Sequence, residues 1–349
     1  MEMGGDGEYS YYKNRPVLEE AVAQLCRERL SEEDCLRMAE MGCASGANTL
    51  LPLWEIIETI DSTCRALNHH QKAPPALQFF LNDLPRNDFN ALEKEKLGKL
   101  IGPCFVAAMP GNFHGRLFPD NSLHFVHSSY SLHLLSKVPA GLVSESGVPL
   151  NKGNICWGNP SSPSSVHKAY RDQFEKDFTY FLRSRSSEVI SGGRMVLTFP
   201  GSSDHHPACK YGSKIWIAIG DCLKEMVDER KIEELKLDSF NIPSYSPSAQ
   251  YVRQLIQREG SFDIARLEEI DIMWDANIED GNQDLVFDKW ARGKYVSTFI
   301  RAITESILAS QFGSAVMDDL FNRLSLKCTN YLEEGMALCH TLVISMIMK

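Results

Sequence analysis

Short apolar segments alternate with amphipathic segments through the first two hundred residues of this chain. Large apolar side chains recur every three or four positions in 48–67, as they do on one face of a helix. The apolar segments end in small or polar residues and are typical of strands: 36–42, 77–83, 104–111 and 122–133. This alternation predicts a mostly parallel sheet covered by helices.

The rest of the chain completes this sheet and adds a helical layer. The segment 169–193 carries aromatic residues on one helical face and closes on a glycine pair, which predicts that the helix stops there. Strand-like content returns at 194–201, 262–274 and 340–348, and helical patterns lie at 214–228, 249–258, 290–308 and 312–329. We therefore expect an α/β core at 1–200, completed by 262–274 and 338–349, and a helical cap at 201–261 and 275–337.

Composition excludes several classes of partner. The net charge is −10 and no Lys/Arg block is present, so we expect no nucleic acid as a partner. The ten cysteines form no C-x-x-C pair, which argues against a zinc site or a disulfide framework and favours reduced thiols. No segment has about 18 uninterrupted apolar residues and no secretory signal pattern is present, so we expect a cytoplasmic protein that binds a small molecule.

A glycine-containing turn follows the first predicted strand. It reads Gly42-Cys43-Ala44-Ser45-Gly46 and comes directly after Glu40-Met41. A dinucleotide loop has the form G-x-G-x-x-G, whereas this turn is G-x-x-x-G preceded by an acid. An acid beside the loop favours a cationic ligand such as S-adenosylmethionine over a pyrophosphate.

Several longer blocks carry a specific resemblance, and they run nearly from end to end: GGDGEYSYYKN, GCASGANTLL, FFLNDLPRNDFN, AMPGNFHGRLFP, HFVHSSYSLH, NKGNI, GGRMVLTFPG, KLDSFNIPSYSPS and RAITESILASQFG. The chain resembles the plant SABATH methyltransferases, which include carboxyl methyltransferases of salicylate, benzoate and jasmonate and N-methyltransferases of the caffeine pathway. The resemblance implies a Rossmann-like class I methyltransferase sheet with an α-helical cap.

The resemblance also implies a set of cofactor-binding positions. Residues on the methionine side of S-adenosylmethionine are Tyr11, Cys43 and Asn48. Asp83 takes the ribose hydroxyls, a suitable role for a carboxylate at a strand end. The adenosine lies against Leu84 and Phe113, with Asn112 in the same block and Ser129 closing the region.

The acceptor pocket and the chemistry follow from the same resemblance. Tyr130 and His133 are the catalytic candidates, since the ring of Tyr130 suits the sulfonium and His133 holds or deprotonates the acceptor. Methyl transfer requires mainly alignment and desolvation, so no Ser/His/Asp device is expected. The remaining substrate-binding candidates are Leu134, Trp216, Tyr245, Ile300 and Ile303.

The resemblance further implies a structural magnesium position and a homodimer. One carboxylate, two amides and a backbone carbonyl are suitable hard ligands for this cation. They are Asn151, Asp238, Phe240 and Asn241.

The sequence departs from the family pattern near the acceptor. A glutamine that follows the SYAKNS block in the family has no counterpart here, and Leu134 stands where relatives usually have tryptophan. Glu40 replaces the usual aspartate and Asn112 the usual serine. Carboxyl O-methylation of a small planar plant acid is slightly favoured over N-methylation of a xanthine, and a catalytically degenerate cofactor-binding relative is the third hypothesis.

Overall fold

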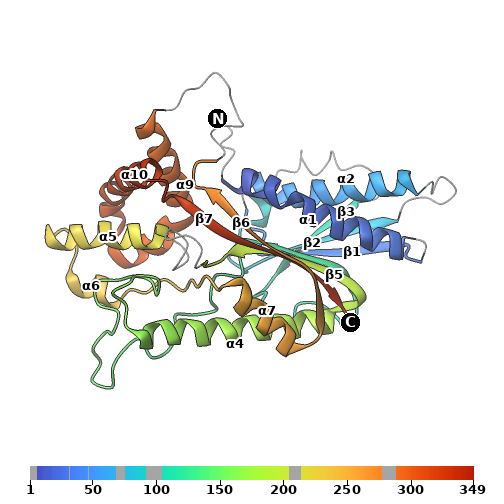
Figure 1. Ribbon diagram of the computed structural model, residues 1–349, viewed down its shortest axis with the longest axis horizontal. Helices are drawn as coiled ribbons and strands as arrows, with labels where there is room; N and C mark the ends of the chain where they lie inside the picture. The colour runs from blue at the N-terminus through green and yellow to red at the C-terminus, as the bar shows by residue number, and fades with distance from the viewer. Residues whose placement is uncertain are drawn as a thin grey trace.

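A computed structural model describes residues 6–30, 32–45, 47–67, 75–91, 104–203, 214–276 and 288–349. At its centre is a seven-stranded sheet in the order β3-β2-β1-β4-β5-β7-β6 (Figure 1). Its strands are β1 (Cys35–Met41), β2 (Ala76–Asp83), β3 (Cys104–Pro110), β4 (Leu123–Ser129), β5 (Val189–Pro200), β6 (Phe262–Met273) and β7 (Leu338–Met348). Neighbouring strands from β3 to β5 pair in parallel, whereas β7 is antiparallel to both β5 and β6.

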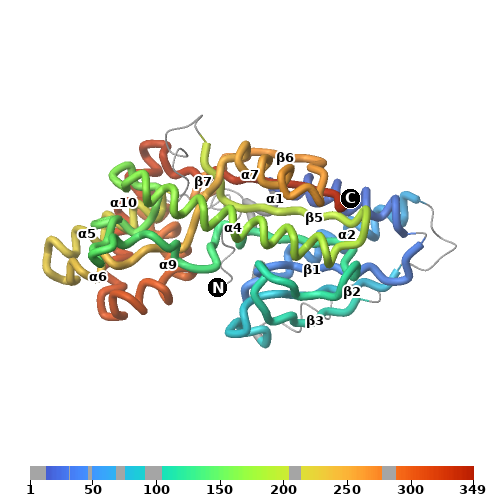
Figure 2. Tube along the Cα trace, turned by 90° about the horizontal axis from the view of Figure 1, so that it is seen from below, coloured from blue at the N-terminus to red at the C-terminus, as the bar shows by residue number. Residues whose placement is uncertain are grey.

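Helices cover both faces of the sheet and one end of it (Figure 1). One face carries α1 and α2, and the other carries α4 and α7. The remaining helices gather at one end of the sheet, as Figure 2 also shows. Bounds are α1 (Asp6–Arg29), α2 (Leu51–Ala66, after the 3-10 turn η1, Ala47–Leu50), α4 (Ser164–Glu188), α5 (Lys214–Asp228), α6 (Glu234–Ser239), α7 (Ala249–Glu259), α9 (Lys289–Phe312) and α10 (Met317–Glu333).

The central strands are apolar on both faces because helices cover both. In β1, Leu36 and Met38 join the core under α1 and α2, whereas Ala39 and Met41 join the core under α4. A strand buried on both sides has a nearly continuous apolar sequence instead of an alternating one. This explains why 36–42 could be recognised as a strand from its composition.

A separate apolar core holds the helices at the end of the sheet. It joins α5, α9 and α10, and it includes Ala337, directly before β7. Because β7 starts where β5 ends, with Thr341 opposite Pro200, these helices lie beyond the carboxyl ends of the parallel strands. The helix α7 is different: it packs on α4 and β6, so this part of the predicted cap lies on the sheet.

The predicted end of the long helix at 169–193 is wrong. The helix α4 ends at Glu188, and the glycine pair lies inside β5. Gly192 has φ of +77°, and a Cβ on Gly193 would lie 3.1 Å from the carbonyl oxygen of His124 on β4. The pairing of β4 with β5 shifts register at this point, so the glycines allow a close, irregular strand contact.

The described part of the chain also shows the state of the cysteines and the character of the helices. None of its nine described cysteines forms a disulfide, as expected for reduced thiols. Among the described helices, none is both long and apolar enough to cross a membrane.

Candidate active site

The loops that follow β1, β2 and β3 are tied together by the backbone and one buried amide. The N–H groups of Gly42 and Cys43 both donate to the carbonyl of Asn82, at 2.9 Å each. The Asn82 side chain donates in turn to the carbonyls of Met109 (2.7 Å) and Gly111 (3.0 Å). The predicted glycine turn therefore lies at the carboxyl edge of the sheet, in contact with the ends of its neighbours.

Asp83 lies at the end of β2 with its carboxylate beside the glycine turn. Its Oδ2 accepts the N–H of Ala44 at 2.8 Å and its Oδ1 accepts the N–H of Leu84 at 2.7 Å. Asn87 donates to the carbonyl of Ala44 at 2.9 Å, which holds the same loop from the other side. A carboxylate oxygen can accept more than one hydrogen bond, so this orientation leaves capacity for ligand hydroxyls.

The predicted adenosine residues lie next to this carboxylate. A Cβ on Gly42 would be 3.7 Å from Cε1 of Phe113, which places the Phe113 ring against the glycine turn. Asn112 is exposed, and its Oδ1 accepts the N–H of His114 at 3.0 Å. Leu84 is 54% exposed, an apolar side chain left open to a ligand or solvent. These residues, with Asp83, form one side of the site.

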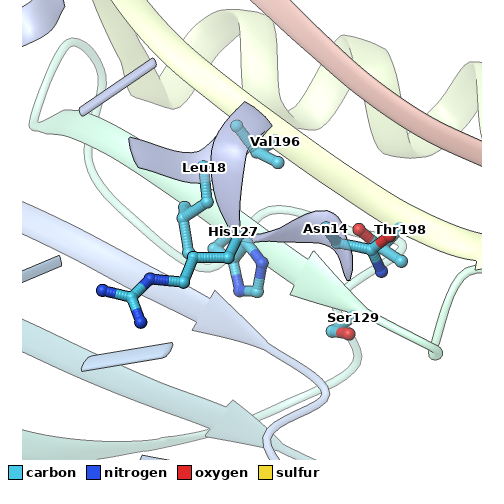
Figure 3. A pocket seen from close by; sticks show the side chains of 7 residues that line it. Asn14, Leu18, His127, Ser129, Val196 and Thr198 are labelled. Atoms are coloured by element: carbon cyan, nitrogen blue, oxygen red, sulfur yellow. The ribbon is translucent and has the colours of Figure 1, made fainter. Parts of the chain in front are cut away.

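The end of β4 forms the other side. Ser128 Oγ donates to the carbonyl of Met41 at 3.0 Å, and Ser131 Oγ donates to the carbonyl of Gly42 at 3.1 Å. Ser129 lines a small pocket between α1 and the sheet (Figure 3). The other residues that line it are Asn14, Arg15, Leu18, His127, Val196 and Thr198.

Glu40, the acid before the glycine turn, has a partner that the sequence did not predict. Its Oε2 lies 2.5 Å from Nδ1 of His127, and both side chains are buried. A buried carboxylate is stable only when it is paired and hydrogen-bonded. The Glu40–His127 pair therefore lies beside the pocket of Figure 3, which His127 lines.

Tyr130 is held in a constrained conformation. Its φ is +52°, its N–H donates to the carbonyl of Thr198 at 2.7 Å, and its hydroxyl is 2.9 Å from Oγ1 of Thr341. A non-glycine residue with positive φ is uncommon, and such strain often marks functional positions. The tyrosine is therefore fixed between β4, β5 and the start of β7.

His133 and Leu134 lie on the next turn of chain. The carbonyl of His133 accepts the N–H of Tyr245 at 2.9 Å, and Leu134 pairs with Ser244. Nδ1 of His133 is buried and has no hydrogen-bond partner in the described structure, and burial lowers the pKa of this imidazole to about 4. A neutral ring nitrogen without a partner is a candidate contact for a ligand.

Comparison with known proteins shows the family of the chain. A family model described as "SAM dependent carboxyl methyltransferase" matches residues 1–349. The chain belongs to this family. The methyltransferase is similar to a probable caffeine synthase from Coffea canephora, with 42% identity over 376 residues that cover 99% of this chain and 96% of the relative. A 3,7-dimethylxanthine N-methyltransferase from Coffea arabica is 40% identical over 375 residues, with the same coverage.

A solved structure supports the same assignment at the level of the fold. Loganic acid methyltransferase with SAH has a TM-score of 0.77 and 29% identity, covering 99% of this chain and 98% of that chain. The prediction of a class I methyltransferase fold of the SABATH family is confirmed. This methyltransferase therefore uses S-adenosylmethionine as its methyl donor.

The predicted substrate residues of the methyltransferase do not all lie together. The ring of Tyr245 packs on Trp157, with centroids 4.7 Å apart, and its backbone is the part that contacts His133. Trp216 and Ile300 pack in the core of the cap, and Ile303 is 60% exposed. Their roles as substrate residues stay predictions.

Two of the predicted cofactor residues are only partly described. Tyr11 lies in α1 and Asn48 lies in η1, and their side chains are outside the described part of the structure. Cys43 is buried beside the glycine turn, and burial strongly raises the pKa of its thiol. Cys43 is therefore a neutral packing group at neutral pH.

The predicted magnesium ligands lie together, but hydrogen bonds occupy the amide oxygens. Asn151 donates to Oδ1 of Asn241 at 2.9 Å and accepts the hydroxyl of Ser162 at 2.8 Å. Asp238 Oδ1 accepts the N–H of Gly153 at 2.8 Å, and Phe240 packs in the cap core. Among the described residues, no group of three or more His, Cys, Asp or Glu could hold a metal. Amide and carbonyl oxygens lie outside that count, and the magnesium site stays a prediction.

Tyr130 gives a testable prediction about the start of β7. We expect Thr341→Val to lower kcat about 3–10-fold, because one hydrogen bond of about 0.5–1.5 kcal/mol no longer fixes the Tyr130 hydroxyl. Affinity for S-adenosylhomocysteine, measured by calorimetry, stays the same. Ser345→Ala, on the same strand, is the matched control and leaves kcat unchanged. An unchanged kcat in Thr341→Val contradicts this role.

Proposed function

We propose that this methyltransferase transfers the methyl group of S-adenosylmethionine to a ring nitrogen of a flat, neutral, purine-like heterocycle of the xanthine class. The sequence slightly favoured carboxyl methylation. The observation that carries the present proposal is the neutral imidazole of His133, whose buried Nδ1 has no partner in the described structure. The likeness to the 3,7-dimethylxanthine N-methyltransferase from Coffea arabica supports it.

The chemistry of the acceptor loop supports a neutral acceptor over a carboxylate. Residues 128–135 supply hydroxyls, a tyrosine and a neutral imidazole, but no cationic side chain. Binding a carboxylate away from water requires cations or several N–H donors. Leu134 replaces the tryptophan of relatives, which removes one such donor. An N-heterocycle requires only an acceptor for its N–H, and the neutral imidazole of His133 supplies one at Nδ1 in the tautomer that carries its proton on Nε2.

Catalysis in this proposal is a matter of position and charge. When bound, S-adenosylmethionine supplies an electrophilic methyl group on a cationic sulfur, and in-line attack by the nitrogen lone pair releases S-adenosylhomocysteine. Asp83 and Phe113 would hold the nucleoside end, and the ring of Tyr130 would stabilise the cationic sulfur by cation–π attraction of about 0.5–2 kcal/mol. His133 orients the acceptor molecule by accepting a hydrogen bond from a ring N–H of that molecule. The attacked nitrogen loses its own proton to solvent as its bond to the methyl carbon forms, because an imidazole with a pKa of about 4 holds a proton poorly.

Direct assay of acceptors tests the proposal. The protein is incubated with methyl-labelled S-adenosylmethionine and 7-methylxanthine, salicylate, benzoate, jasmonate or loganic acid. We expect label in the xanthine product that resists mild alkaline hydrolysis, since an N-methyl group is stable where a methyl ester is cleaved. Alkali-labile label from an acid, with none from the xanthine, overturns the proposal.

Carboxyl O-methylation is the second candidate. The description of the family model and the likeness to loganic acid methyltransferase favour it. A degenerate relative that binds cofactor without turnover is the third. A thermal-shift titration with S-adenosylhomocysteine separates these readings from a chain that no longer binds cofactor, because a ligand of the folded state raises Tm. Turnover in the acceptor assay then separates an enzyme from a degenerate relative.

His133 predicts a pH dependence of stability. The pKa of His133 is lowered from 6.5 to about 4 by burial, so the unfolded chain takes up a proton below pH 6.5 that the folded protein does not. Stability is unaffected above pH 6.5 and falls as the pH drops from 6.5 to 4, by about 2–3 kcal/mol at most. Urea unfolding of His133→Gln should lack this part of the decline, whereas an identical decline in both proteins contradicts the assignment.

The size of the side chain at position 134 is expected to determine how many different acceptor molecules the enzyme methylates. This side chain is 43% exposed, so a larger ring has room to cover more of the acceptor. We expect Leu134→Trp to narrow the range of acceptors by several-fold in kcat/KM, because one extra apolar contact contributes about 1–3 kcal/mol to discrimination. Leu326→Trp, on the exposed face of α10, is the control. A broader range in Leu134→Trp contradicts the prediction.

The cytoplasmic location and the homodimer are further proposals that rest on the sequence. A fluorescent fusion tests the location. Size-exclusion chromatography with light scattering tests the dimer.

A further inference from the structure

A fully buried ion pair lies at the end of α4, outside every position that the sequence singled out. Arg185 and Glu188 have no exposed surface, and Nε of Arg185 donates to Oε2 of Glu188 at 2.7 Å. Burial of two charges is costly, and an ion pair of this kind often adds no net stability over apolar residues of the same size. The pair therefore calls for a reason other than stability alone.

The remaining hydrogen-bonding capacity of the pair is directed at one loop. Arg185 Nη1 donates to the carbonyl of Phe113 at 2.6 Å, and Nη2 donates to the carbonyl of Gly115 at 2.8 Å. Glu188 Oε1 accepts the N–H groups of Leu117 at 2.5 Å and Phe118 at 3.0 Å. Four backbone groups of the segment 113–118 are thus fixed by two side chains from a rigid helix.

The same helix also fixes the ring of Phe113. The guanidinium of Arg185 lies over the ring of Phe181, 5.1 Å from its centroid. Phe181 meets Phe113 edge to face, with centroids 6.3 Å apart and planes at 83°. Phe113 in turn lies against Gly42 of the glycine turn. The contacts form a continuous path from the ion pair to the loop that faces the nucleoside.

We propose that Arg185 and Glu188 are positioning residues that hold Phe113 at the angle required to stack on the adenine of the cofactor. The inference rests on the proposed function, in which Phe113 contacts the adenosine. The pair affects only the part of the site that binds the methyl donor. Its loss weakens binding of S-adenosylhomocysteine and raises KM for the methyl donor, and it leaves KM for the acceptor unchanged.

A double-mutant cycle with Phe113 tests this role. The variant Arg185→Met/Glu188→Met removes both charges together and so leaves no unpaired buried charge. Calorimetry below the melting temperature should show a Kd for S-adenosylhomocysteine about 10-fold higher than in the parent protein. When Phe113→Ala is already present, the same pair of changes should raise Kd less than about 2-fold, because residues that act through one contact are not additive.

Two further variants complete the design. Glu188→Gln keeps the size of the side chain and an oxygen acceptor for Leu117 and Phe118, but it leaves the buried charge of Arg185 without a carboxylate, so its Kd is measured at a temperature below its own Tm. Glu188→Gln should raise the Kd for S-adenosylhomocysteine about 3-fold, and this rise should largely disappear when Phe113→Ala is already present. The matched control is Arg194→Met: Arg194 is also buried, but it donates to Gln24 and Glu28 of α1, and its loss leaves Kd unchanged.

The outcomes distinguish this inference from the proposed function. An unchanged Kd in the folded pair variants, or a rise that persists without Phe113, overturns the positioning role. If Asp83→Asn and Phe113→Ala weaken binding while the pair variants do not, only this inference fails. If Asp83→Asn and Phe113→Ala also leave Kd unchanged, the cofactor lies elsewhere and both fail.

Discussion

Replacing Asp83 with alanine is expected to lower the affinity for S-adenosylhomocysteine at least about 100-fold, since each hydrogen bond to a charged group contributes about 1.5–3 kcal/mol and we propose that Asp83 accepts two of them from the ribose hydroxyls. The carboxylate lies at the end of β2, and two backbone N–H groups fix its direction. The ligand therefore meets an acceptor that is already oriented. Isothermal calorimetry measures the change, and kcat at saturating cofactor should fall far less.

Two controls separate binding from damage to the loop. Asp83→Asn keeps an oxygen that can accept the N–H of Ala44, so it tests the charge with the glycine turn held in place. Asp263→Ala removes an exposed carboxylate of β6 that lies 3.4 Å from Lys349, and it should leave affinity unchanged. A folded Asp83→Ala protein with parental affinity shows that the ribose is not bound here.

Gly42→Ala should abolish cofactor binding and destabilise the protein by about 2–4 kcal/mol, the sum of a positive-φ penalty and a steric collision. Gly42 has φ of +76°, and an added Cβ would lie 2.2 Å from Oγ and 2.5 Å from Cβ of Ser131. Ser131 cannot turn away without losing its hydrogen bond to the carbonyl of Gly42. The loops after β1 and β4 must therefore move apart.

Gly147→Ala is the matched control for backbone strain. Gly147 has φ of +80°, and nothing lies within 4 Å of an added Cβ. Its loss of stability, about 1 kcal/mol, measures the conformational cost alone. Thermal or urea unfolding compares the two variants. Equal losses at both positions contradict the view that Ser131 limits the space beside the turn.

The sequence predicted those features that depend on residues close together in the chain, such as the strands and the turn that follows the first of them. Strands buried on both faces are continuous apolar runs, and the turn at Gly42 lies where such a run ends. Asp83 could be found for the same reason, since it ends the next strand. These signals are local, and the structure places each of them at the carboxyl edge of the sheet.

The sequence did not predict contacts between distant residues. Glu40 and His127 are 87 positions apart, and the link between Arg185 and Phe113 spans 72. Nothing in the neighbourhood of either residue indicates its partner. The glycine pair at 192–193 misled the prediction for a related reason: glycine ends helices and also permits close strand contacts, and only the position of β4 shows which applies.

The strand β7 lies inside the sheet although it is the seventh along the chain. It separates β5 from β6, and it pairs with β6 along its whole length and with β5 from Thr341 to Ile347. A ribosome must therefore synthesise residues 338–348 before the hydrogen-bonding edges of β5 and β6 are covered. Until then the edges of β5 and β6 that pair with β7 stay open in the nascent polypeptide, so the seven-stranded sheet is complete only once β7 has been made.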